Sequence, residues 1–176
     1  MEAEGALPAN DSPYWLRFIF GKNPSVTLLR IIILTLVSLI IFKFILLPIR
    51  VTGDSMYPTY KNGQIRVVNR LAYMRHAAER GDVVAVEFRG QQVLLLKRII
   101  GLPGERFHVF NGEVYINGEK ISEPYAHGKI PGPTGGLGTT RQPIDLGRTE
   151  YMVIGDNRPI SVGFIKDREQ LVGKVL

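Results

Sequence analysis

A run of apolar residues near the start of the chain most constrains how the chain can fold. Residues 26–47 read VTLLRIIILTLVSLIIFKFILL, and only Arg30 and Lys43 in this run are charged. As a helix the run is about 33 Å long, enough for a bilayer core of about 30 Å, and both cations lie near its ends, where long side chains reach the headgroups. A core helix of a soluble protein would be apolar along one stripe only. We therefore predict one transmembrane anchor helix over residues 26–49.

The flanks of this run indicate its orientation and its fate. Three cations precede the centre of the predicted helix and two follow it closely, so the positive-inside rule only slightly favours a cytoplasmic N-terminus. The run ends in Leu46-Leu47-Pro48 without a small-residue cleavage site, which favours an uncleaved anchor over a signal peptide. Residues 1–25 have no sustained period, and we expect them to form an irregular cytoplasmic tail.

Residues 50–176 have a soluble composition and are rich in short β-type runs between turn signals. Asn111-Gly112 and Asn117-Gly118 each separate strand-like residues, which is the strongest short hairpin signal. Residues 126–143 are rich in Gly and Pro and predict a long surface loop. The predicted strands are Ile65–Asn69, Val83–Phe88, Gln92–Ile100, Phe107–Phe110, Val114–Ile116, Tyr151–Ile154 and Leu171–Val175. The predicted fold is mainly β: a compact, extracytoplasmic all-β domain on a single membrane helix.

The composition excludes several kinds of chemistry. The chain contains no Cys, which rules out disulfides, a thiolate nucleophile and Cys-ligated zinc. Its three His residues are widely spaced and form no metal-binding motif, so we expect no metal. The net charge of +6 favours contact with anionic membrane lipid but is weak support for a nucleic-acid partner, and we expect none.

The segment Gly53–Thr59 holds a serine in a setting that can expose its hydroxyl group. Gly53 permits a close backbone approach, and Pro58 stiffens the turn that follows Ser55. Taken alone, however, Gly-Asp-Ser is more often a plain turn in which Asp and Ser bond to backbone N–H groups. This segment by itself favours the turn.

Lys97 is the second unusual residue, because it lies inside an apolar run. In a strand it would share a face with Leu95 and Ile99, while Arg98 would point the other way. One interpretation is an edge-strand lysine that discourages aggregation. The other is a desolvated amine whose pKa falls from about 10.4 to about 7–8, which would make it a general base towards a serine hydroxyl. The run alone leaves both open.

A serine paired with a lysine is a known form of hydrolase chemistry that needs neither His nor Asp. Four segments, in order after an N-terminal anchor, resemble the bacterial type I signal peptidases, which are membrane-anchored serine proteases. The matching segments are Gly53–Thr59, Arg80–Val84, Lys97–Glu105 and Gly155–Arg158.

This resemblance implies roles for individual residues. Ser55 would be the nucleophile and Lys97 the general base, and the main-chain N–H of Ser55 would contribute to the oxyanion hole. Ser161 would match the family's serine that bonds to the catalytic amine. The residues implied to support the nucleophile loop are Gly53, Asp54, Met56 and Pro58, and those implied to support the lysine are Arg98, Asp156, Arg158 and Ser161, with Arg98 and Asp156 forming an ion pair.

Two departures from the family pattern concern these supporting residues. Some members carry a hydroxyl residue as a second oxyanion donor where this chain has Gly53, and losing such a donor costs about 2.7–4 kcal/mol in an enzyme that relies on it. A related subgroup also has Gly there, so we expect another donor or a weaker oxyanion hole. After Arg158 the family often continues Asp-Asn-Ser-x-Asp-Ser-Arg, whereas residues 159–164 read PISVGF and lack the Asp-Ser-Arg stretch.

The resemblance implies a serine endopeptidase that removes signal peptides from exported preproteins through an acyl-enzyme. The implied substrates carry small side chains, usually Ala, at the first and third positions before the scissile bond. The implied enzyme acts on the extracytoplasmic side of the cytoplasmic membrane, rests an apolar surface on lipid and needs no metal or nucleotide cofactor. Two alternatives stay open: a Ser-Lys maturation peptidase for a narrow set of exported substrates, and a catalytically dead, membrane-tethered binding module. The oligomeric state is not indicated.

Overall fold

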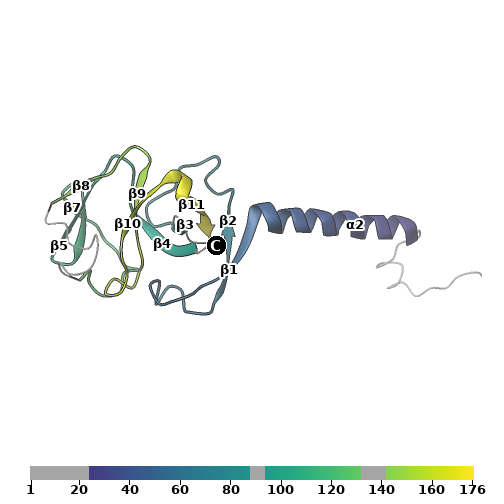
Figure 1. Ribbon diagram of the computed structural model, residues 1–176, viewed down its shortest axis with the longest axis horizontal. Helices are drawn as coiled ribbons and strands as arrows, with labels where there is room; N and C mark the ends of the chain where they lie inside the picture. Colours follow the sequence, from purple (N-terminus) through teal and green to yellow (C-terminus); the bar gives the residue numbers. More distant parts are fainter. Residues whose placement is uncertain (1–23, 88–93, 132–141) are drawn as a thin grey trace, which may run out of the picture. The chain divides into compact units, whose positions relative to one another are not determined.

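The computed structural model describes residues 24–87, 94–131 and 142–176, and the chain divides into two units, Met1–Ile41 and Phe42–Leu176. The first unit contains helix α2, Pro24–Ile40 (Figure 1). The helical residues Ser25–Ile45 form one continuous span of 21 residues that is long and apolar enough to cross a membrane. The predicted tail, residues 1–25, lies outside the described residues except at its end.

The anchor helix ends earlier than we expected. Helix α2 continues as the π-helical segment η1, Ile41–Ile45, and strand β1 then begins at Leu46 and ends at Arg50, so the helix does not reach residue 49. The difference has a physical reason: Pro48 cannot donate a hydrogen bond inside a helix, but it is tolerated in an edge strand. Strand β1 is an edge strand, and its one partner among the described residues is β2, Ile65–Asn69, with a register from Leu46↔Asn69 to Arg50↔Ile65.

The larger sheet of the second unit, sheet A, has seven strands in the order β1-β2-β11-β3-β4-β9-β10, all antiparallel (Figure 1). Its remaining strands are β3 (Val83–Glu87), β4 (Leu94–Gly101), β9 (Glu150–Ile154), β10 (Phe164–Asp167) and β11 (Leu171–Val175), with the short 3-10 helix η3 (Arg168–Gln170) before β11. The prediction of a mainly β domain is confirmed.

A smaller sheet, sheet B, has the strand order β7-β6-β5-β8. Its strands are β5 (Arg106–Phe110), β6 (Glu113–Ile116), β7 (Glu119–Lys120) and β8 (Ile144–Asp145). Both predicted Asn-Gly hairpins are present: Asn111 and Asn117 have φ values of 52° and 53°, and the glycine after each also has a positive φ, as tight hairpin turns require. Of the predicted loop 126–143, residues 132–141 lie outside the described part of the chain.

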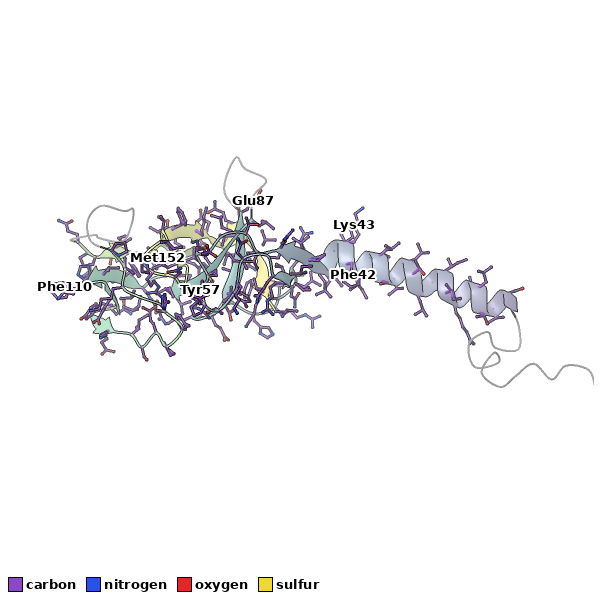
Figure 2. The ribbon with its side chains drawn as sticks, turned by 90° about the horizontal axis from the view of Figure 1, so that it is seen from below. Phe42, Lys43, Tyr57, Glu87, Phe110 and Met152 are labelled. Atoms are coloured by element: carbon purple, nitrogen blue, oxygen red, sulfur yellow. The ribbon has the colours of Figure 1, made fainter. Side chains whose placement is uncertain are left out.

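Buried apolar side chains join the two sheets and carry the site. One cluster packs Ile100, Met152 and Ile154 of sheet A against Phe107 and neighbouring residues of sheet B. Another packs Val51 and Met56 against strands β3 and β4. Within the second unit, Lys43 and Phe110 lie at opposite ends and Tyr57 lies between them (Figure 2). The loop that carries Ser55 is therefore fixed to the middle of the unit.

Candidate active site

Ser55 lies on a rigid turn that follows β1. The turn starts at Val51, whose backbone is held by two hydrogen bonds of 2.8 Å, to Gln64 and from Gly63. Gly53 has a φ of +86°, a conformation that favours glycine. The next anchor is Met56, which is only 1% exposed, while Ser55 itself is half-buried. The core therefore holds the turn on both sides of the serine and leaves its hydroxyl within reach of a substrate.

The main-chain N–H of Ser55 is available as a donor. Within the described residues no protein acceptor receives it. The N–H of Gly53, in contrast, donates to Asn62 Oδ1 at 3.3 Å. The turn can therefore offer one backbone donor to a developing oxyanion, next to the hydroxyl that would attack.

Lys97 is a buried amine rather than a solvated edge lysine. Its side chain lies in the middle of β4, is 5% exposed and donates to Ser161 Oγ at 3.0 Å. Burial lowers the pKa of Lys97 to about 8, against the opposing effect of the nearby Asp156 carboxylate. An amine with such a pKa is partly neutral near pH 8 and can accept a proton. In the described part of the chain it donates to Ser161, and no hydrogen bond joins it to Ser55 Oγ.

Ser161 reaches Lys97 although the last motif is shortened. The residue is 8% exposed, and its hydroxyl oxygen also accepts the N–H of Gly155 at 2.7 Å. These two hydrogen bonds fix the orientation of the hydroxyl group and of the lysine side chain. The missing Asp-Ser-Arg stretch therefore does not prevent this contact.

Asp156 is the centre of a buried network. Arg98 holds its carboxylate with two hydrogen bonds of 2.8 and 2.6 Å, and Thr59 Oγ1 donates to it at 2.5 Å. The carboxylate is 0% exposed, so it is buried with compensating partners on both oxygens. Arg98 also donates to the carbonyl oxygen of Gly81 at 2.6 Å. Four segments that are distant in sequence, at residues 59, 81, 98 and 156, thus meet around the Arg98–Asp156 pair.

The turn that follows β9 is locked directly onto the nucleophile loop. Asn157 donates from its backbone N–H to the carbonyl oxygen of Ser55 and from Nδ2 to that of Asp54, both at 3.0 Å. Gly155 packs so closely against Ser55 and Ser161 that a Cβ atom there would lie less than 3.0 Å from atoms of both. The positions of Ser55 and of the Lys97–Ser161 pair are therefore fixed by the same few residues.

Arg158 supports this turn, and among the described residues no hydrogen bond joins it to Lys97. Its side chain is 2% exposed, donates to both carboxylate oxygens of Glu123 at 2.8 and 2.6 Å, and donates to the carbonyl oxygen of Gly155 at 3.2 Å. Tyr125, two residues after Glu123, lies with its ring over Arg98, 4.1 Å from guanidinium carbon to ring centroid.

The sequence alone did not assign a role to several residues in this arrangement. Thr59, Gly155 and Asn157 lie inside the family motifs, so the motifs are the sequence signal for them. Glu123 and Tyr125 lie between motifs, and nothing in the local pattern marks them.

A small hollow lies beside Ser55. Its volume is about 20 Å³, close to the space that one water molecule or one methyl group occupies. The lining residues are Val51, Thr52, Gly53, Ser55, Met56 and Leu94–Leu96. A larger cavity of about 530 Å³ lies on the outer face of sheet B, around His108, Phe110 and Tyr115, and contains none of the predicted site residues. We place the site at the smaller hollow because the potential nucleophile lines it.

The strand that borders this hollow has a free edge. Strand β4 pairs with β3 over Leu94–Arg98, but with β9 only from Arg98 onwards. On the side away from β3, Leu94–Lys97 therefore has no partner strand among the described residues. An extended peptide could pair there, next to the hollow and to Ser55.

Among the described residues, no group of three or more His, Asp or Glu side chains could hold a metal ion. The chemistry that the site can perform rests on a hydroxyl group, a buried amine and a backbone donor. A serine hydrolase with a lysine base uses this set of functional groups.

Comparison with known proteins places the chain within a family. The family model described as signal peptidase, peptidase S26 matches residues 25–176, and the chain belongs to this family. It is 39% identical over 159 residues to signal peptidase I of Bacillus amyloliquefaciens, a match that covers 89% of this chain and 77% of that protein. It is 39% identical over 132 residues to signal peptidase I S of Bacillus subtilis (strain 168), covering 73% and 71%. It is 34% identical over 164 residues to signal peptidase IB of Staphylococcus aureus (strain Mu50 / ATCC 700699), covering 84% and 85%.

Proposed function

We propose that this protein is a membrane-anchored serine endopeptidase that removes signal peptides from exported preproteins, with Ser55 as nucleophile and Lys97 as general base. The observation that carries the proposal is the convergence of a held serine and a buried lysine on the turn 155–161, in a chain of the signal peptidase family. The apolar span fits an anchor, and exported preproteins present their cleavage sites outside the cytoplasmic membrane, so we place the second unit there.

In the proposed reaction Ser55 Oγ attacks the scissile carbonyl carbon while Lys97 Nζ takes the hydroxyl proton. The main-chain N–H of Ser55 donates to the resulting oxyanion. When the C–N bond breaks, Lys97 gives its proton to the amine of the mature protein, and the signal peptide remains as an ester on Ser55. Lys97 then takes a proton from water, which attacks the ester carbonyl carbon. When the ester C–O bond breaks, Lys97 returns that proton to Ser55 Oγ, the signal peptide leaves as a carboxylic acid and the free enzyme is restored. Hydrogen bonds between catalytic groups are often long in the unliganded site and shorten when substrate binds, which accounts for the amine resting on Ser161 here.

The hollow beside Ser55 supports a preference for small side chains. A substrate paired with the free edge of β4 would be extended, so its first and third residues before the scissile bond would face the same side. A hollow of about 20 Å³ has room for an Ala methyl group and not for a leucine side chain. The backbone pairing would supply affinity without reading other side chains.

The proposal is tested by cleavage of a preprotein that carries an Ala-x-Ala site by the purified full-length protein in detergent. We expect a single cut after the second Ala, identified by mass spectrometry, and no cut when that Ala is replaced by Trp. A well-folded parent that fails to cut any preprotein would refute the proposal and favour a non-catalytic binding module. Cleavage of one exported substrate only would favour the narrow maturation peptidase.

The pH dependence of kcat/KM is expected to follow the titration of the Lys97 amine. Only the neutral amine can accept the serine proton, and burial lowers the pKa of Lys97 to about 8, so kcat/KM should rise with pH up to about 8 and level off above it. Below that point the rate should fall about tenfold for each pH unit. A profile that is flat between about pH 6 and pH 9 would show that no such base titrates in the free enzyme.

The size of the hollow should set the accepted side chain. Leu96→Ala removes part of its lining. We define the selectivity as the rate of cleavage of a substrate with Val or Leu directly before the scissile bond, divided by the rate for the same substrate with Ala there. This ratio is expected to be at least about tenfold higher in Leu96→Ala than in the parent. Leu146→Ala is the matched control, because Leu146 is also buried, but in the cluster between the two sheets. Equal selectivity in both variants would mean that the hollow does not bind that side chain. Competition between two labelled peptides measures the ratio.

A further inference from the structure

The segment Glu123–His127 is bonded to the last motif at both of its ends. His127 donates from its backbone to the carbonyl oxygen of Asp156 at 2.7 Å and accepts the N–H of Arg158 at 2.9 Å. Glu123 holds the side chain of Arg158 through two hydrogen bonds. The segment is thus fixed at both ends, and Tyr125 lies between these fixed points.

The ring of Tyr125 covers the cation of the Arg98–Asp156 pair. The guanidinium carbon lies 4.1 Å from the ring centroid, the shortest of the distances between a cation and an aromatic ring found among the described residues. The Arg98 side chain is 12% exposed, so the interaction takes place largely out of water, where it is stronger. The phenol hydroxyl group donates to Glu123 Oε1 at 3.3 Å.

We infer that Tyr125 is a positioning residue of the proposed Ser55–Lys97 site, which holds Arg98 on Asp156 through the face of its ring. This inference rests on the proposed function. It accounts for how a chain without the Asp-Ser-Arg stretch keeps its last motif in place: the segment 123–127, far from that motif in sequence, supports it from outside.

The charges around Asp156 explain how this support reaches the amine. Asp156 is the charged group that acts on Lys97, and its negative charge raises the pKa of Lys97. Arg98 neutralises that carboxylate, and the groups that act electrostatically on Arg98 are Asp156, Tyr125 and Tyr60. If Arg98 loses its place on Asp156, the carboxylate acts on Lys97 uncompensated. Lys97 would then hold its proton at higher pH and be a poorer base near neutrality.

The test compares Tyr125→Leu with Tyr125→Phe in the full-length protein in detergent. We expect Tyr125→Leu to lower kcat about fivefold with little change in KM, and to move the acidic limb of the pH profile to higher pH. Tyr125→Phe keeps the ring face and should leave both unchanged. Tyr115→Leu is the control, because Tyr115 is a half-buried ring on sheet B whose ring contacts are His108 and Phe110.

Two further measurements keep the inference falsifiable. If Tyr125→Leu does not fold, fluorinated phenylalanines at position 125 keep the shape of the ring while weakening its negative face, and the acidic limb should then shift in proportion to fluorination. The pH dependence of Lys97 acetylation, followed by mass spectrometry, reports the same shift without catalysis, so an inactive parent would refute the proposed function and not this inference. The inference would be overturned if Tyr125→Leu and the fluorinated variants all left both the acidic limb of the pH profile and the pH dependence of Lys97 acetylation unchanged.

Discussion

Ser55→Ala and Lys97→Met are each expected to abolish preprotein cleavage while leaving the fold intact. The first removes the attacking oxygen. The second replaces an amine by a side chain of similar length that cannot accept a proton, in a site where the amine is 5% exposed. Loss of a general base costs about 10²–10⁴-fold in rate, and loss of the nucleophile removes the acyl-enzyme pathway altogether. Single-turnover cleavage of an Ala-x-Ala preprotein at pH 8 measures both.

Matched variants separate chemistry from folding in this prediction. Ser122→Ala alters an exposed serine, and Lys166→Met alters another buried lysine of sheet A, which is 6% exposed. Both should cleave nearly as fast as the parent if they keep its circular dichroism spectrum. Because methionine avoids the desolvation of a buried ammonium group, Lys97→Met should be as stable as the parent or more so. Residual activity in Lys97→Met above about a tenth of the parent rate would contradict the assignment of the base.

Gly155→Ala is expected to reduce cleavage by about two orders of magnitude, because the added methyl group would meet the Ser55 carbonyl oxygen and Ser161 Oγ at less than 3.0 Å. The two atoms belong to the nucleophile loop and to the partner of Lys97. The methyl group must therefore push apart the two halves of the site. Neither neighbour is the free end of a long side chain, so the strain cannot be relieved locally. The loss should appear mainly in kcat, since the atoms nearest to the added methyl group belong to Ser55 and Ser161 and not to the free edge of β4.

Gly163→Ala is the matched control for this substitution. Gly163 lies directly before β10 and has no positive φ, and a Cβ atom there would lie 3.1 Å from its nearest neighbour, Ile154 Cγ1, a far milder contact than the 2.2 Å at Gly155. We expect Gly163→Ala to keep most of the activity. If both variants lose activity equally, the strain at Gly155 does not act through Ser55 and Ser161.

The elements of the fold were predictable where local signals are strong. Strands β2 and β11 have the predicted bounds, and the two hairpins follow from Asn-Gly pairs. Strand β1 was missed because an apolar strand that follows an apolar helix continues the same hydropathy signal. Strands β7 and β8 have two residues each, too short for any period to show, and β10 (FIKD) lies directly after the irregular last motif. The strand order is not encoded in local pattern at all.

The site was predictable where its residues are chemically unusual. Lys97 in an apolar strand and Ser55 in a stiff turn stand out in the sequence, and the structure brings both to the turn 155–161. Thr59 and Asn157 form hydrogen bonds across 97 and 103 residues, and such contacts leave no trace in local pattern. Tyr125 was not predictable because its role depends on where Arg98 lies in three dimensions. The family resemblance of the motifs therefore pointed to the proposed reacting groups, while the groups that orient them required the fold.

The long sequence separations within the site have a consequence for when the site forms during folding. Its hydrogen bonds join residues that are 64, 97 and 103 positions apart in sequence. In the larger sheet, β11, the last strand in sequence, lies between β2 and β3. Contacts over such distances form late in folding, because the entropy of closing long loops is lost before the contacts stabilise anything. A partly folded chain would thus hold Ser55 and Lys97 but no site. Proteolytic activity should appear only when the sheet is complete, in step with the last cooperative folding event.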